Sequence, residues 1–493
     1  MCERSRCATV FSDFSQSRQG QLAEVSLAKK CLEAVSHDIT PDQLLKMFEI
    51  KADHQFPIAL LFLLLFISRP ITAQNSPDPV SLRFPLLDLP DNAPPRIVIP
   101  TMPQSRELTN DWYQGAHYAI AKYGAGHPIT SEIADYGFDL FSIWLPFGVS
   151  WMHEEWHRAV LSSSGIRSFN EIYAFRLFSP VIKVSGVADN DLAALKRDHP
   201  ADMVRLAEAG VEGEYARVAA VERDRFFFGV NNYDHLTDIL SIVNCIAYEG
   251  LSTTEFADRT TRDLLRSENT DERTRDVLGW DFTSWIYDLS RPAEPYAARG
   301  IHPSGAGVNR YITTDDLASD EIGFLKLQGW LSLLNLLDPA LYGMHEIAKR
   351  DGIALGFSCR HLLTSFGYCA DLELRMRKSP VNIFIALHNY ANHDRYFPGV
   401  EAALLQYPIG KFAAISPRCA FWLQPESNRF RTRQSAAGAL GEIEITGFPQ
   451  DLWQPYVSLS GKTAGWSIGE AQLGPAMMVR GGVAMRLPGR VRK

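Results

Sequence analysis

The chain carries two kinds of hydrophobic pattern, and the first predicts helices from about residue 106 to residue 365. One such stretch follows a polar cap and stops at Gly124. Two later stretches, 140–152 and 327–337, are very apolar. Both are shorter than the ~18 uncharged residues that a membrane-spanning helix needs. They therefore predict buried helices in a helix-rich domain.

After residue 366 the pattern changes to an alternation of apolar and polar residues, which predicts strands. The alternating stretches, separated by turn residues, are 372–376, 381–387, 442–446, 456–460 and 477–487. Several short strands in succession indicate an antiparallel domain, either a sandwich or a small barrel, over 366–488. The predicted fold class is therefore α+β, with a helix-rich domain followed by a β domain and a basic tail at 489–493.

The amino-terminal region is typical of a targeting segment. Residues 56–67 are twelve uncharged residues, which is too short for a span and suits the apolar part of a signal peptide. Because a signal peptide starts near its own amino terminus, Met47 is the expected start, with cleavage after Ala73. Residues 1–46 are then upstream sequence, the alternative being that 56–67 is a short buried helix or an uncleaved anchor. Eight prolines lie between Pro77 and Pro103, so the segment 74–105 is expected to be an extended linker.

The net charge of the chain argues about its binding partner, and its cysteine content argues about its cellular compartment. A net charge of −8 and the lack of a basic run argue against nucleic acid as the main partner. Three of the seven cysteines precede the expected cleavage site. The four that remain are Cys245, Cys359, Cys369 and Cys419, and they allow two disulfides with three possible pairings. This fits an exported protein of the periplasm, the outer membrane or the secreted space.

The candidate chemistry lies in SWMHEEWHRAVLSSSG, which is expected to be a helix between Gly148 and Gly165. His153 and His157 are one turn apart on the same face of this helix, so both imidazoles can point at one ion. Glu154 is rotated beside them, close enough to act on water held by that ion. The flanking residues are apolar, and a buried helix with two histidines and a glutamate needs partners or a metal. The alternative is an amphipathic helix with a polar surface.

The segment His153-Glu154-Glu155-Trp156-His157 resembles the HExxH motif of the zincin metallopeptidases. The resemblance implies Zn²⁺ held by the two histidines, with Glu154 as the general base. It also implies a helical metallopeptidase-like domain over 106–365.

The third metal ligand is expected from a later helix, because the glycine and histidine of the extended HExxHxxGxxH form do not follow here. In the stretch 201–221, a spacing of about 100° per residue places Glu214 within an apolar stripe, and Glu208 and Glu212 toward a polar side. A carboxylate on an apolar stripe needs a charged partner, which a zinc ion provides. Glu214 is therefore the predicted ligand, with Glu212 as the reserve.

The segment EGEYARVAA resembles the ligand helix of the membrane-associated gluzincins related to the CAAX-prenyl protease and the heat-shock peptidase. The likeness covers about 65 residues of the two helices. It departs from that group at Arg217 and Val218, where the group has an aspartate.

Other polar residues are weaker candidates. Tyr233 and His235 could donate hydrogen bonds to an oxyanion, and Asp238 could orient a ligand histidine. His302 lies in a glycine-rich loop without a phosphate-binding pattern, and HNYANH at 388–393 offers histidines near the end of a strand. Helix caps, surface positions and a turn are the simpler interpretations of these residues.

Together these patterns predict an exported zinc-dependent hydrolase that acts on a peptide or protein substrate. The competing interpretation is a non-enzymatic envelope protein or outer-membrane β-barrel, in which the HExxH segment is incidental and the β domain provides a possible outer-membrane association.

Overall fold

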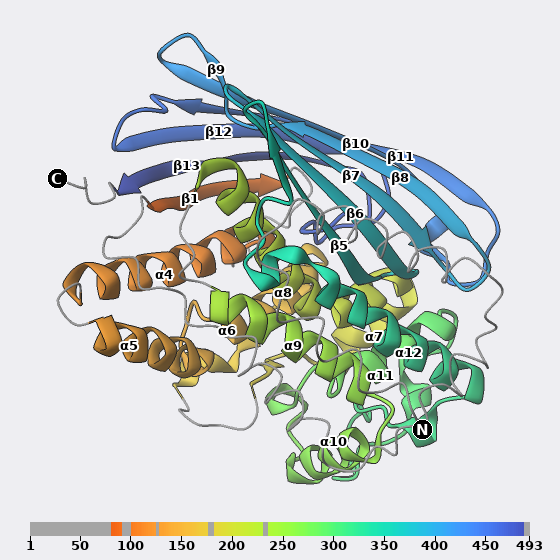
Figure 1. Cartoon of the computed structure of the whole chain (residues 1–493). Coiled ribbons are helices and arrows are strands. Elements are labelled where there is room, and N and C mark those ends of the chain that lie inside the picture. The colour runs from red at the N-terminus through yellow and green to blue at the C-terminus, as the bar shows by residue number, and fades with distance from the viewer. Residues whose placement is uncertain (1–79, 91–99, 125–127, 176–181, 230–234, 488–493) are drawn as a thin grey trace, which may run out of the picture. The chain divides into compact units, whose positions relative to one another are not determined.

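The computed structural model describes residues 80–90, 100–124, 128–175, 182–229 and 235–487. The expected signal peptide and upstream segment, most of the linker, Tyr233 and the basic tail lie outside these ranges. The described part combines helices with one large antiparallel sheet, which confirms the α+β fold class (Figure 1). Within these ranges no helix combines the length and the hydropathy that crossing a bilayer requires.

The helices precede most of the strands in the chain. They are α4 (Met102–Tyr123), α5 (Pro128–Phe141), α6 (Val149–Ser163), α7 (Asp189–Asp198), α8 (Pro200–Phe228), α9 (His235–Leu251), α10 (Glu255–Ser267), α11 (Asp281–Ser290) and α12 (Ser319–Leu331). Their ends follow local chemistry: Thr101 caps α4 together with Gln104, and Gly229 ends α8 in a left-handed conformation at φ 64°.

The central helix is α8, which packs against α4, α6, α7, α9, α11 and the sheet. Its 29 residues span about 43 Å at 1.5 Å per residue. Side chains are buried on all of its faces, including those of Glu208 and Glu212. The prediction that Glu208 and Glu212 lie on a polar side of this helix is therefore wrong, because other elements cover the helix on all of its faces.

The sheet has eleven strands in the order β1-β13-β12-β11-β10-β8-β7-β6-β5-β4, with β9 paired to β10. The strands are β1 (Val80–Pro90), β4 (Ala348–Arg350), β5 (Ile353–Thr364), β6 (Gly367–Lys378), β7 (Val381–Ala391), β8 (Tyr396–Leu404), β9 (Tyr407–Ile409), β10 (Ala413–Pro425), β11 (Ser435–Gly447), β12 (Trp453–Lys462) and β13 (Ala476–Leu487). A separate two-stranded sheet pairs β2 (Phe169–Asn170) with β3 (Val184–Ser185). Among the described strands the large sheet is a single layer that ends at β1 and β4, where a sandwich or a small closed barrel was predicted.

The expected domain boundaries differ from the structure at two places. Part of the predicted linker forms β1, which pairs with β13 at one edge of the sheet. Proline has no backbone N–H to donate, and an edge strand tolerates this because it has a partner strand on one side only. At the other edge, β4 and β5 start before residue 366. The described residues belong to one compact unit, in which β1 packs against α4 and β5 against α8.

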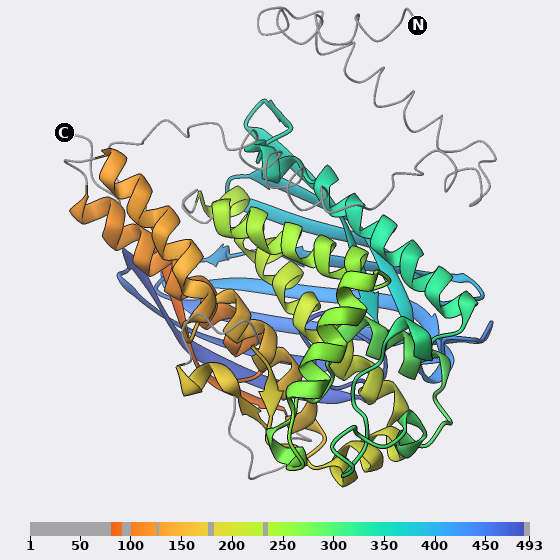
Figure 2. The ribbon, with the colours of Figure 1, turned by 90° about the horizontal axis from the view of Figure 1, so that it is seen from below.

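The helices gather on one face of the sheet. Figure 1 shows the strands as a layer along the helices, and Figure 2, seen from below, shows the helices lying across that layer. The four cysteines expected after the leader are free thiols. The two disulfides that their even number allowed are therefore not formed.

Candidate metal centre

The HExxH segment lies on α6, as the glycines at its ends predicted. Gly148 caps the helix, which ends at Ser163, and Gly165 follows with φ 78°. The side chains of Trp151, Met152 and Trp156 are buried on this helix, so α6 is part of the core. The alternative of an amphipathic surface helix is thereby excluded.

Two glycines of α8 allow α6 to approach closely. A Cβ atom at Gly210 would stand 2.2 Å from Nε2 of His153 and within 2.5 Å of two further ring atoms. A Cβ at Gly213 would meet the indole of Trp156 at 2.8 Å. The His153 ring therefore lies directly against the backbone of α8. His153 and Trp156 are three residues apart on α6, as Gly210 and Gly213 are on α8, so each ring meets one glycine and the position of the imidazole is set.

Hydrogen bonds on one side of each imidazole fix its orientation. His157 Nδ1 donates to the carbonyl oxygen of Leu206 at 2.6 Å, and His153 Nδ1 donates to Oε1 of Glu214 at 2.9 Å. Since both partners are acceptors, the proton sits on Nδ1 and the Nε2 atoms are left to bind something else. Such outer contacts are typical of metal-binding histidines.

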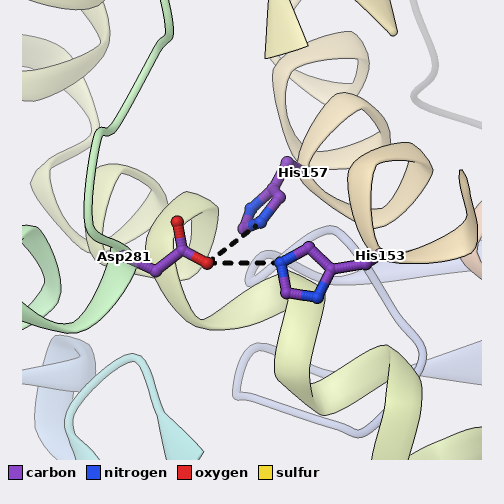
Figure 3. A group of neighbouring side chains, drawn as sticks. All are labelled: His153, His157 and Asp281. Carbon is purple, nitrogen blue, oxygen red and sulfur yellow. Dashed lines mark hydrogen bonds and ion pairs between the residues drawn. The ribbon is translucent and has the colours of Figure 1, made fainter. Parts of the chain in front are cut away.

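Asp281, the first residue of α11, completes the group. Its Oδ2 lies 3.3 Å from Nε2 of His153 and 3.4 Å from Nε2 of His157. Figure 3 shows the three side chains converging from two helices. The three ligand atoms lie within 4.8 Å of one another, so this group could hold a metal ion.

Glu214 and Glu212, predicted as the third ligand and its reserve, occupy other places. Glu214 contacts the Nδ1 side of His153, facing away from His157. Glu212 pairs with Arg205 and accepts the amide of Gly469 at 2.8 Å, beneath the sheet. The geometry thus assigns the third position to Asp281, and Glu214 becomes the residue that orients His153.

The electrostatics of the three residues favour opposite charges. Burial raises the pKa of Asp281, but His157 and His153 outweigh it and lower that pKa to about 2. Burial acts to lower the pKa of His153, yet the Asp281 and Glu214 carboxylates hold it well above its usual value. The pKa of His157 is raised in the same way by Asp281. The Asp281 carboxylate is thus charged, and the two imidazoles are the cationic side chains that stabilise its charge.

Glu154 lies beside this group without joining it. Its side chain is buried, and burial raises its pKa, as does the negative charge of Asp281. Asp276 is also buried, and desolvation together with Glu154 and Asp281 raises its pKa to about 8. The centre therefore has two carboxyl groups with a raised pKa, that of Asp276 lying at about 8.

A second group of possible ligands lies under the sheet, formed by Cys369, Asp371 and His388. His388 Nδ1 donates to Asp371 at 2.8 Å, and the Cys369 thiol donates to the same oxygen at 2.8 Å. Burial acts against the charged imidazole, but Asp371 raises the pKa of His388 to about 9. These two contacts have the length of hydrogen bonds, and His388 Nε2 lies 3.9 Å from Glu401, so hydrogen bonds and an ion pair explain this group.

The remaining predicted candidates have structural partners. Asp238 pairs with Arg217 at 2.9 Å and with Arg225 at 2.6 Å. His302 contacts Ser304 and lies 3.4 Å from Glu268, and His393 contacts the neighbouring Asp394. The side chain of His235 lies outside the described residues. None of these three placed residues joins the metal group.

Asp281 was missed at the sequence level, as was the contribution of Gly210. An acidic residue at the start of a helix usually serves the helix dipole, so no pattern in the sequence marks Asp281 as a metal ligand. Comparison with known protein families, with curated proteins and with solved structures found no match. The function of this chain must therefore be inferred from its own residues.

Proposed function

We propose that this protein is a zinc-dependent hydrolase that cleaves peptide bonds. The observation that carries the proposal is the convergence of His153 Nε2, His157 Nε2 and Asp281 Oδ2, with Glu154 buried beside them. Two imidazoles and one carboxylate are a donor set typical of catalytic zinc sites, which leave a fourth position open.

The distances from the Asp281 oxygen to the two ring nitrogens match the spacing of ligands around a zinc ion. With bonds of about 2.0 Å, the edge of a tetrahedron around zinc measures about 3.3 Å. The Asp281 oxygen lies 3.3 Å and 3.4 Å from the two ring nitrogens. A charge-assisted hydrogen bond is shorter, at about 2.7–2.9 Å, which is the length of the contact between His153 Nδ1 and Glu214.

Glu154 takes the part of the general base. When bound, a zinc ion supplies a Lewis acid and makes water in the site more acidic. Glu154 accepts the proton of that water and passes it to the leaving amine. Burial raises its pKa above the usual range, which makes its carboxylate a stronger base.

Tyr248 provides a hydrogen-bond donor at the same site. Its hydroxyl oxygen accepts the amide of Asp281 at 3.2 Å, which leaves its own proton to donate. The centroid of its ring lies 6.4 Å from that of His153. We assign Tyr248 to stabilising the negative charge that develops on the carbonyl oxygen of the substrate.

A cavity near Asp276 gives a direction for substrate approach. It has a volume of about 490 Å³, and its lining includes Glu268, Tyr311 and Lys183. Glu268 accepts the amide of Asp276 at 2.9 Å, and Asp276 in turn acts on Glu154. This volume suits a few residues of peptide, and the cavity wall at Glu268 is linked to Glu154 through Asp276.

The test compares two variants in zinc content and in peptide hydrolysis. Glu154→Gln keeps the shape of the side chain and removes the base, so the protein should keep its zinc and lose hydrolysis by several orders of magnitude. His157→Ala should lose the metal, because two ligands bind zinc poorly. Glu155→Gln is the matched control, since Glu155 pairs with Arg158 at 2.6 Å away from the metal group.

The possible outcomes test zinc binding and peptide hydrolysis separately. Hydrolysis that survives Glu154→Gln would exclude Glu154 as the base. A wild-type protein that binds zinc and cleaves nothing in a broad peptide library would leave the metal centre in place and refute the peptidase.

A further inference from the structure

The large sheet has its polar side toward the helices and its apolar side outward. In β12, Gln454, Tyr456, Ser458 and Ser460 are buried, while the residues between them are exposed. Those residues are Trp453, Pro455, Val457 and Leu459. A sheet of a water-soluble protein covered on one face by helices is expected to show the opposite arrangement.

Charged side chains fill the inner face and pair with one another. Arg418 pairs with Glu401 at 2.9 Å, and Arg480 with Glu470 at 2.8 Å. A cavity of about 300 Å³ lies among these charges, between the sheet and the helices α4 and α8. Most of the charged side chains of this interior are therefore paired with one another, and the apolar side chains of the strands are left to the outside.

The outward residues form one continuous surface across the strands. Along one row, strand pairing joins Cys359, Leu372, Leu387, Val400 and Phe421. A second row joins Pro417, Ile443, Leu459, Val479 and Leu89. From β7 to β13, the outward positions of the described long strands carry no charged side chain.

Such a surface is larger than water-soluble monomers expose. Phe421 is 58% exposed, Leu459 54% and Met477 57%. Contiguous exposed apolar patches of more than a few hundred Å² mark a contact with another body. No helix covers this face in the described part of the chain (Figures 1 and 2).

The dimensions of the strands favour a lipid layer as that body. The long strands have 9–13 residues, with β8 the shortest and β10 and β11 the longest. A tilted strand needs about 9–11 residues to cross the hydrocarbon of a bilayer. A contact between two copies of the protein would not require neighbouring strands to have similar lengths.

The two ends of the strands match the two boundaries of a bilayer. One end carries exposed aromatic residues in and beside the strand connections: Tyr407, Phe412, Phe448 and Trp453. Aromatic rings gather where hydrocarbon meets head groups. The opposite end carries four exposed arginines, Arg395, Arg429, Arg431 and Arg433, which suit anionic head groups.

We propose that the outward face of the sheet from β6 to β13 lies against the acyl chains of a lipid bilayer. The apolar rows lie in the hydrocarbon, with the aromatic end and the arginine end at its two boundaries. At the two edges of the sheet, β1 packs against α4, and β4 pairs with residues 353–355 at the start of β5. This surface is independent of the metal centre.

The test is flotation of the purified full chain with vesicles of zwitterionic lipid, alone and with one third anionic lipid. Wild-type protein should float with both, and more strongly with anionic lipid. Phe421→Glu and Val457→Glu place a charge in the apolar rows and should lower the bound fraction at least ~10-fold. Phe256→Glu, at a 61% exposed position on α10, is the matched control and should float like the wild type.

Sedimentation of the same proteins without lipid identifies a different occupant. A wild-type protein that forms stable dimers, does not float, and becomes monomeric with Phe421→Glu would show that a second copy covers the face. A soluble monomer that floats with neither vesicle would also overturn the proposal. Circular dichroism checks that the outward substitutions, which touch no interior side chain, keep the fold.

Discussion

Buried charged side chains are frequent in this protein. The side chains that contact each of them determine whether it can bind a metal ion or forms an ion pair. At the candidate metal centre, Asp281 lies 3.3 Å and 3.4 Å from the Nε2 atoms of His153 and His157, which is the spacing of ligands around one ion. Under the sheet, Asp371 faces a protonated His388 and a thiol, so its charge is already matched. The same residue types therefore form a metal centre in one place and a structural ion pair in the other.

The structural role of His388 predicts a specific dependence of stability on pH. Asp371 raises the pKa of His388 to about 9 in the folded protein, against about 6.5 in the unfolded chain. Because the folded pKa is raised, its contribution is complete below pH ~6.5 and is lost as the pH rises through about 9. A shift of this size corresponds to about 3 kcal/mol.

The measurement is the free energy of unfolding of the wild type and His388→Gln at pH 6 and pH 10. The two proteins should differ most at pH 6 and much less at pH 10. A difference that stays constant, or grows toward high pH, would show that His388 is not a protonated partner of Asp371.

At the scale of single elements, the metal centre depends on how closely α6 and α8 approach. The helix α6 supplies both histidines and Glu154, and α8 supplies Glu214 and the bare backbone at Gly210. The third helix, α11, contributes Asp281 at its first turn and packs against α8. A small change at the crossing of α6 and α8 should therefore affect the site without removing any ligand.

Gly210→Ala tests this dependence. The added methyl group would overlap the imidazole of His153, so the ring must move and zinc affinity should fall at least ~10-fold. Gly323→Ala is the control, since Gly323 lies in α12 with nothing within 4 Å of an added Cβ. It should keep zinc affinity and stabilise the helix by about 0.5–1 kcal/mol. Equal zinc dissociation constants for the two variants would contradict the packing described for α6.

Local patterns predicted much of these elements, and the missing parts have a common cause. The helix of the HExxH segment and the strands after residue 366 follow from short-range periodicity, and both predictions are confirmed. Asp281 lies 128 residues beyond His153, so only tertiary packing brings it to the site. Glu214 was assigned from the face of its helix, but a helix buried all round has no face that singles out one carboxylate.

At the scale of the whole molecule, the helices and the sheet form one compact unit. The sheet receives strands from both ends of the described chain, since β1 pairs with β13, and α8 crosses beneath its other edge. The alternation of apolar and polar residues predicted strands after residue 366. It did not indicate which face of the sheet would pack against the helices. That choice is set by the charges of the inner face, which find their partners only after the elements assemble.

The assembled molecule places the candidate metal centre in the helical layer and an apolar surface on the far face of the sheet. If both proposals hold, the protein is a hydrolase held at a membrane, with a substrate cavity on the helical side. The two parts share no residue, so loss of one should leave the other intact.

The most direct test of the central claim is the zinc content of purified Asp281→Asn, measured by elemental analysis beside the wild type. The wild type should carry one zinc per chain, and Asp281→Asn should carry almost none, because an amide replaces the charged third ligand. Glu214→Gln should bind zinc about 10–100-fold more weakly and still be loaded at excess metal. A wild type without zinc, or an Asp281→Asn protein that keeps its full content, would contradict the account.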